Sequence, residues 1–118
     1  FLLFIFPTVL FAQKKVIQKK FADGSPQVIY YYDTYFIKSK LVKQEVYFEN
    51  GKLEYSGEWK NDKESGEWIY YYENGKKKAH EYWLNGKETG IWKEYDENGK
   101  LTKETEYKNG KLIKSTNY

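Results

Sequence analysis

The chain has 118 residues, of which 20% are aromatic, and a formal net charge of +3 from 20 basic and 17 acidic side chains. The length suits a single domain, and the absence of cysteine excludes disulfides, thiol chemistry and cysteine zinc sites. The 13 tyrosines and 4 tryptophans argue against disorder, because disordered chains are poor in aromatic residues, and they leave little aliphatic material for a thick two-layer core.

Residues 1–12, FLLFIFPTVLFA, are uncharged and almost wholly apolar, and the polar sequence QKK follows at once. This segment is too short to span a bilayer, which takes about 20 residues. Its length and the small residue Ala12 match the apolar region and cleavage site of a secretory signal, whereas Pro7 disfavours the alternative of a buried first strand or helix. We therefore expect a signal peptide whose first residues are missing from the chain. The mature protein would begin near Gln13, have no transmembrane span and work in the periplasm or outside the cell.

Residues 13–41 are predicted to form a divergent N-terminal β segment, because they follow the later repeat only loosely. QVIYYY at 27–32 is similar to EWIYYY at 67–72, but DTYFIKSK at 33–40 has no counterpart. Residues 42–118, by contrast, repeat with a period that is typical of repeat architectures. Two series of asparagines, at positions 50, 74 and 98 and at positions 61, 85 and 109, keep a period of 24 residues, and the steps between the series alternate between 11 and 13.

Each half of the repeat has room for one strand and one turn, which predicts an all-β fold: an elongated antiparallel meander of β-hairpins in a largely single-layer sheet. Asn-Gly between alternating segments is the strongest short hairpin signal, since both central residues of a type I′ turn need positive φ. A wider loop is predicted where a second glycine follows, closing at Gly66 and at Gly90. The predicted Asn-Gly turns are Asn50-Gly51, Asn74-Gly75, Asn98-Gly99 and Asn109-Gly110. The predicted strands are 14–22, 27–36, 41–49, 52–60, 66–73, 76–84, 90–97, 100–108 and 111–118.

A two-residue turn at Asn74-Gly75 would place Glu73 opposite Lys76, Tyr71 opposite Lys78 and Trp68 opposite Glu81. Alternation along each strand then sorts the side chains into an aromatic face and a charged face. The aromatic face is predicted to hold Phe48, Leu53, Tyr55, Trp59, Trp68, Tyr70, Tyr72, Trp83, Trp92, Leu101 and Tyr107. The charged face is predicted to hold the pairs Glu49/Lys52, Glu73/Lys76 and Glu97/Lys100, with Tyr47, Tyr71 and Tyr95 between them.

The sequences YSGEWKNDKESGEW at 55–68 and YYYENGK at 70–76 resemble the MORN repeat, and most closely the bacterial variant known as YwqK-like antitoxin proteins. The resemblance covers residues 42–118. It implies an elongated antiparallel meander that acts as an interaction or scaffold module. The antitoxin variant further implies a partner toxin that is bound and blocked, and the family brings no catalytic residues.

Little in the sequence suggests catalysis. His80 is the only histidine, so a Ser-His-Asp site would have to use it. In the 24-residue register it corresponds to Ser56 and Glu104 on the charged face, which favours a surface histidine. No phosphate-binding glycine loop and no metal-ligand spacing occurs, so we expect no enzyme, no cofactor and no metal. Lysines alternate with acids and arginine is absent, so a nucleic-acid partner is not expected.

The band of tryptophans leaves two interpretations open: it is the core of the sheet, or part of it is a binding surface. Exposed apolar patches mark interaction sites, and Trp and Tyr are favoured as interface anchors. The candidate binding residues are Trp59, Trp68, Tyr70, Trp83, Trp92 and Tyr107. Three hypotheses follow: an exported MORN-like protein that binds another protein through the aromatic face, an antitoxin or immunity protein with a toxin partner, and a protein that binds cell-wall glycans.

Overall fold

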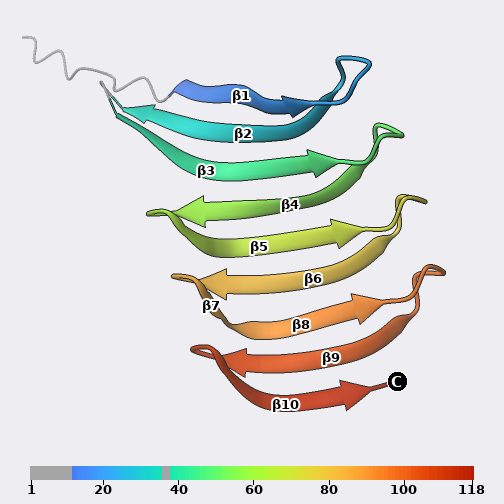
Figure 1. The fold of residues 1–118 in the computed structure, drawn as a ribbon. Coiled ribbons are helices and arrows are strands. Elements are labelled where there is room, and N and C mark those ends of the chain that lie inside the picture. Colours follow the sequence, from blue (N-terminus) through green and yellow to red (C-terminus); the bar gives the residue numbers. More distant parts are fainter. Residues whose placement is uncertain (1–11, 36–37) are drawn as a thin grey trace, which may run out of the picture.

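The computed structural model describes residues 12–35 and 38–118, and in this part of the chain the fold is a single open sheet of ten strands (Figure 1). All neighbouring strands are antiparallel and follow the order of the chain, except that the short β7 pairs only with β6. The all-β meander predicted from the sequence is therefore confirmed. The strands are β1 (Ala12–Lys20), β2 (Pro26–Tyr35), β3 (Lys38–Tyr47), β4 (Leu53–Lys60), β5 (Lys63–Tyr71), β6 (Lys77–Leu84), β7 (Lys87–Glu88), β8 (Gly90–Tyr95), β9 (Leu101–Lys108) and β10 (Lys111–Asn117).

The predicted signal segment, residues 1–12, lies outside the described residues except for Ala12, the first residue of β1. The chain regions that the structure describes contain no helix with the length and apolar character of a membrane span. The N-terminal segment that the sequence marks as divergent joins the same sheet, because β1 and β2 form a hairpin and β2 pairs with β3.

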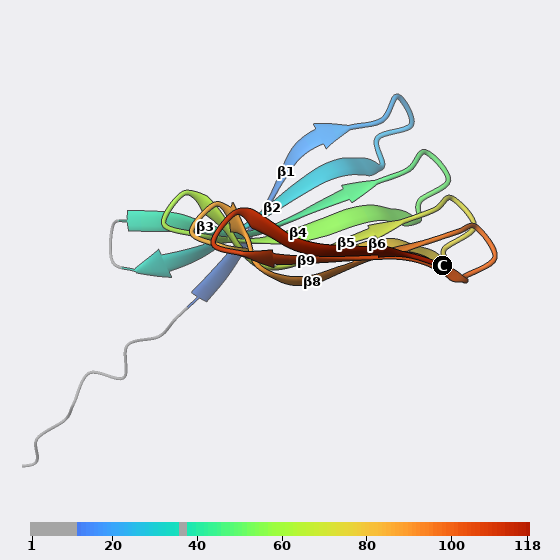
Figure 2. The ribbon, with the colours of Figure 1, turned by 90° about the horizontal axis from the view of Figure 1, so that it is seen from below.

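The sheet is one layer thick, as Figure 2 shows, and its N-terminal strands are twisted relative to the later ones. Twist of this kind follows from the right-handed preference of each strand. A single layer buries few side chains completely. Among the described residues, only Ile29 and Trp68 are buried hydrophobic side chains, with 3% and 7% exposure, and Gln44 and Thr105 are the buried polar ones.

Two classes of turn alternate along the chain, and they lie at opposite ends of the strands (Figure 1). Asn61-Asp62, Asn85-Gly86 and Asn109-Gly110 are two-residue turns in which both central residues have positive φ. The prediction of a type I′ turn at Asn109-Gly110 is thus confirmed. The prediction of wider loops that close at Gly66 and Gly90 is wrong. The chain already turns at the asparagine, and Gly66 and Gly90 lie inside strand segments, with φ of 74° and 68°.

The turns at Asn50-Gly51, Asn74-Gly75 and Asn98-Gly99 are three-residue loops, so the predicted two-residue geometry is wrong there. In the second of them, the Gly75 amide donates to the Tyr72 carbonyl and the Tyr72 amide donates to the Lys76 carbonyl, both at 2.9 Å. The glycine has positive φ (85° at Gly75) and the asparagine does not, which is a type I turn followed by a glycine bulge. Both kinds of turn accept Asn-Gly, so this dipeptide alone does not distinguish them.

The extra loop residue changes the partners nearest to the turn. Tyr71 pairs with Lys77 rather than with Lys78, and Glu73 lies in the loop rather than opposite Lys76. A bulge between Tyr70 and Tyr71 then restores the register, so that Trp68 pairs with Glu81 as predicted. The predicted Glu/Lys pairs of the charged face are wrong for the same reason: their glutamates, Glu49, Glu73 and Glu97, are exposed loop residues.

At each end of the strands, successive turns are linked to one another by hydrogen bonds. The Asn50 side chain donates to the Glu73 carbonyl at 3.2 Å, and the Asn74 side chain donates to the Glu97 carbonyl at 2.9 Å. The Oδ1 atom of Asn74 also accepts from the amide of Lys76 at 2.9 Å. At the other end, the Gly86 amide donates to the Glu64 carbonyl at 2.9 Å. The repeated asparagine therefore holds its own turn and connects it to the next repeat.

Candidate binding groove on the aromatic face

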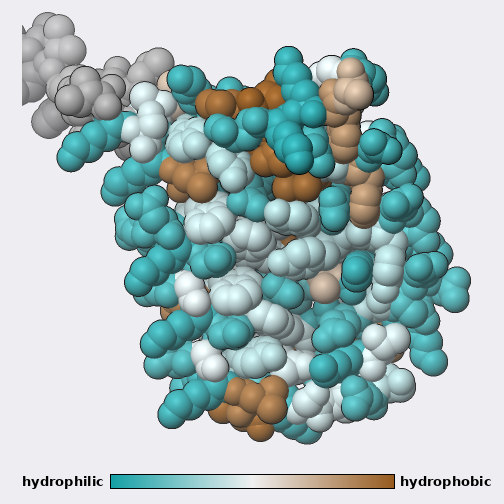
Figure 3. All heavy atoms as spheres, in the orientation of Figure 1, coloured by the Kyte–Doolittle hydropathy of each residue, from teal (hydrophilic) through white to brown (hydrophobic). Residues whose placement is uncertain are grey.

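The four tryptophans lie on one face of the sheet, which we call the aromatic face. Cross-strand partners share a face and side chains alternate along a strand. Trp68 pairs with Glu81, and Trp83 follows Glu81 by two residues on β6. The ring centroids of Trp59 and Trp68 are 5.6 Å apart, and those of Trp83 and Trp92 are 5.1 Å apart. Figure 3 shows this face, with pale aromatic side chains over its middle and hydrophilic side chains along its margins.

The rings form two clusters, one for each of two successive repeats. In the first cluster, Trp68 contacts Trp59 and stacks on Tyr55 at 6.2 Å, and Tyr55 contacts Tyr70 at 5.5 Å. In the second, Trp92 lies between Trp83 at 5.1 Å and Tyr107 at 4.7 Å. Trp68 is buried, whereas the other rings of both clusters are half-buried. The band is therefore core at its centre and accessible around it.

Each indole N–H of the band has a hydrogen-bond acceptor, which fixes the orientation of the ring. Trp68 donates to the Glu58 carbonyl at 3.1 Å and Trp92 donates to the Tyr82 carbonyl at 2.9 Å. These two acceptors are 24 residues apart, as the tryptophans are. The other two indoles donate to side chains: Trp59 to Gln44 at 3.0 Å and Trp83 to Glu81 at 3.0 Å.

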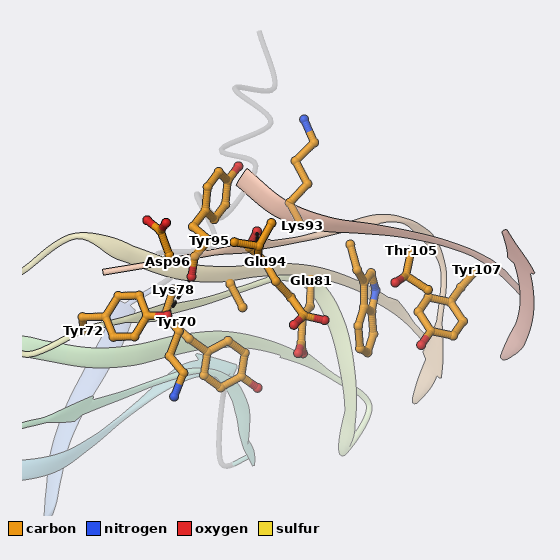
Figure 4. A pocket seen from close by; sticks show the side chains of 13 residues that line it. Tyr70, Tyr72, Lys78, Glu81, Lys93, Glu94, Tyr95, Asp96, Thr105 and Tyr107 are labelled. Atoms are coloured by element: carbon orange, nitrogen blue, oxygen red, sulfur yellow. Dashed lines mark hydrogen bonds between the residues drawn. The ribbon is translucent and has the colours of Figure 1, made fainter. Parts of the chain in front are cut away.

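A groove with a volume of about 540 Å³ opens on the aromatic face over β5, β6, β8 and β9 (Figure 4). The carboxylates of Glu81 and Glu94 lie between aromatic rings of the groove in Figure 4. The aromatic residues of the lining are Tyr70, Tyr72, Trp92, Tyr95 and Tyr107, and the acidic ones are Glu81, Glu94 and Asp96.

The groove exists because the second repeat departs from the first in one row of side chains. Tyr55 pairs with Tyr70 across β4 and β5, and the residues 24 positions later, Ala79 and Glu94, pair across β6 and β8. A methyl group and a carboxylate thus replace two aromatic rings that contact each other at 5.5 Å. The sequence carries this signal as a break in the aromatic repeat, yet Ala79, Glu81 and Glu94 were not among the predicted site residues.

The Glu81 carboxylate is half-buried in the groove. Burial raises the pKa of its carboxyl group above the ordinary value, hydrogen bonds from Trp83 and Tyr70 oppose the rise, and the nearby charges of Glu94 and Glu88 reinforce it. Burial, and after it the negative charge of Glu81, raise the pKa of the Tyr70 hydroxyl. Among the residues that the structure describes, no lysine lies within ion-pair distance of Glu81, whereas Glu94 is 3.6 Å from Lys103.

The opposite face carries His80, whose register with Ser56 and Glu104 is as predicted. Its ring stacks on Tyr82 at 4.6 Å, and its Nε2 atom is 3.5 Å from a Glu67 carboxylate oxygen. In residues 12–35 and 38–118 no group of three or more His, Asp or Glu side chains could hold a metal ion.

The fold defines a class of protein, an open single-layer sheet of β-hairpin repeats with one aromatic face. A family model places the chain within this class: the MORN repeat variant matches residues 40–61, 64–85 and 88–109. These matches cover more than half of the chain, which therefore belongs to this family. Each match spans one hairpin with a three-residue turn: β3–β4, β5–β6 or β8–β9. Searches among curated proteins and among solved structures gave no match.

Proposed function

We propose that the protein is a non-enzymatic repeat protein that binds another protein on its aromatic face. The observation that carries the proposal is the groove of about 540 Å³, whose aromatic walls stay half-buried because no second layer covers them. Tyr and Trp are the side chains that most often anchor protein interfaces. The rings are also held in place before binding by hydrogen bonds such as that from Tyr72 to the Tyr95 carbonyl at 2.7 Å. Rigid anchors lose little conformational entropy when a partner docks.

Photo-crosslinking in the native host tests this proposal. A benzoylphenylalanine is placed at Tyr72, in the groove, and in a matched variant at Ile91, which is exposed on the opposite face. We expect a defined protein adduct from position 72 and none from position 91, identified by mass spectrometry. Equal adducts from both positions, or no adduct from position 72, would overturn the proposal.

The identity of the adduct also separates the narrower hypotheses. A toxin encoded beside this gene would support the antitoxin function that the family resemblance implies. Retention of the protein on purified cell-wall polysaccharide, lost when Trp92 is replaced by alanine, would instead support glycan binding, because stacked aromatic rings suit the faces of sugar rings.

We further propose that the protein is exported, because the apolar segment 1–12 ends at Ala12 and the polar, lysine-rich sequence QKK follows at once. N-terminal sequencing of the protein from its native host is expected to start near Gln13. Recovery of the chain from the cytoplasm with residues 1–12 still attached would contradict export.

A further inference from the structure

We infer that the groove on the aromatic face receives one cationic side chain, a lysine or arginine, from the protein partner. This inference rests on the proposed function and names the chemistry of the contact. Two features of the groove carry it: its aromatic walls, and the half-buried Glu81 carboxylate, which has no lysine within ion-pair distance among the described residues. Rings attract a cation placed over their faces, and a carboxylate supplies the charged hydrogen-bond acceptor that an ammonium or guanidinium group needs.

The carboxylates of the groove are arranged so that a cation would relieve an unfavourable interaction. Glu81 is half-buried, and the indole N–H of Trp83 at 3.0 Å and the hydroxyl of Tyr70 use only part of its acceptor capacity. The charge of Glu94 acts on it from the neighbouring strand. Glu94 itself has a partner, Lys103, but the ion pair is loose. The Nζ atom of Lys103 is 3.6 Å from the Oε1 atom of Glu94, and the side chains of Lys103 and Glu94 are 40% and 55% exposed. An entering cation would share both carboxylates.

The groove already shows that its rings accept an ammonium group. The Nζ atom of Lys78 lies 5.6 Å from the centroid of the Tyr72 ring, and both residues line the groove. This lysine covers one end of the groove. The Tyr107 ring lies with Glu81 and Thr105 away from Lys78 in Figure 4, and the Trp92 ring contacts Tyr107 with their centroids 4.7 Å apart. A second cation therefore has aromatic surface of its own.

The first repeat provides an internal comparison, because it has the rings without the charges. There Tyr55 and Tyr70 occupy the positions of Ala79 and Glu94, and Gly57 occupies the position of Glu81. Its rings pack on one another. The second repeat thus has two carboxylates and a methyl group where the first has two rings and a glycine.

A titration with n-butylammonium chloride, which reproduces a lysine side chain, tests the inference. The four indole N–H signals in a ¹H–¹⁵N NMR spectrum report on the two clusters separately. We expect the Trp92 signal to shift and saturate, with a dissociation constant on the order of millimolar for so small a ligand. The Trp59 signal is expected to stay in place. Sodium chloride at equal ionic strength and 1-butanol, the neutral isostere, are expected to shift neither signal.

Three variants make the test specific. Glu81→Gln keeps an oxygen for the Trp83 indole and removes the charge, and we expect it to weaken n-butylammonium binding at least tenfold. Ala79→Tyr restores the ring of the first repeat, fills the groove and is expected to abolish binding. Glu106→Gln, on the opposite face of β9, is the matched control and is expected to bind as the unmodified protein does. An equal response to 1-butanol, or unchanged binding by Glu81→Gln, would overturn the inference.

The same variants distinguish failure of this inference from failure of the proposed function. If the position-72 crosslink to the partner protein survives Glu81→Gln at full yield, the aromatic face binds a protein but not through a cation, and the inference is wrong. If n-butylammonium binds and no partner protein is captured, the groove has the inferred chemistry, and the proposed protein-binding function is wrong.

Discussion

Gly57 is a position where one added methyl group should disturb the fold. It pairs with Trp68 across β4 and β5, and a Cβ atom placed on it would overlap the Trp68 ring. The ring would have to leave its stacked contact with Tyr55 at 6.2 Å and its hydrogen bond to the Glu58 carbonyl at 3.1 Å. One aromatic pair and one hydrogen bond are each worth about 1 kcal/mol. Alanine returns about 0.5–1 kcal/mol of strand preference relative to glycine, while strain from overpacking adds about 1–3 kcal/mol. We therefore expect Gly57→Ala to lower the free energy of unfolding by about 2–4 kcal/mol.

Urea unfolding, followed by both tryptophan fluorescence and far-UV circular dichroism, measures this change. Ser56→Ala is the matched control, because it alters the adjacent residue on the opposite face and should stay within about 0.5 kcal/mol of the unmodified protein. The next repeat shows how a Cβ is accommodated there. Glu81 holds the position equivalent to Gly57, and Trp92, the equivalent of Trp68, contacts Tyr107 on β9 at 4.7 Å. An unchanged midpoint for Gly57→Ala would mean that Trp68 can move in the same way at no cost, and would refute the reasoning.

Three further changes test the turns, the core and the charged face. Gly75→Val should destabilise by more than about 1 kcal/mol in urea unfolding, since φ is 85° at Gly75 and a β-branched residue is strained there; a change within about 0.5 kcal/mol would contradict the turn. Trp68→Ala should cost about 3–5 kcal/mol, as truncations of buried aromatic residues do, whereas Trp92→Ala should cost less and reduce partner capture instead. Burial alone would raise the pKa of the Glu45 carboxyl, but hydrogen bonds from Lys43 and two tyrosines lower it below its ordinary value. Its stabilisation is therefore present above the unfolded-state pKa and lost as the pH falls through the folded-state pKa, below about 4.5. Glu45→Gln should flatten the acid side of the stability curve, and an unchanged slope would contradict this assignment.

The sequence predicts the order of the strands and the face of the tryptophans because both depend only on alternation and period. A turn of two residues and a turn of three differ by one residue, and one residue exchanges the faces of a strand. The bulge between Tyr70 and Tyr71 absorbs this residue, so the predicted partner of Trp68 is correct although the predicted turn is not. The bulge itself has no sequence signal comparable to Asn-Gly.

The sequence predicts two classes of turn, but the structure has the longer and the shorter turn at exchanged positions. Steps that alternate between 11 and 13 residues require one shorter and one longer connection, and the second glycine in NDKESG suggested the longer one at Asn61. In the structure that glycine, Gly66, lies next to Glu58 on β4. It is part of an irregularity in the pairing of β4 with β5, where the register shifts between Gly57 and Trp59. The same three-residue turn also joins β1 to β2, where the Gly24 amide donates to the Phe21 carbonyl at 3.0 Å. The N-terminal segment is thus a hairpin of the same design with Asp23 in place of asparagine.

The sequence does not predict the groove, because the repeat pattern shows what the repeats share, whereas the groove lies where they differ. In a single-layer sheet the core is formed by aromatic residues that recur with the repeat. Each ring packs on the ring of the next strand, as Tyr55 packs on Tyr70. A site needs an interruption of that packing, since a continuous row of rings leaves no hollow. Ala79 supplies the hollow, and Glu81 and Glu94 supply the charge. Filling the hollow, as in Ala79→Tyr, should extend the packing of the first repeat and stabilise the sheet while closing the groove. A variant that is more stable and no longer binds would show that the second repeat keeps its smaller core for the sake of its ligand.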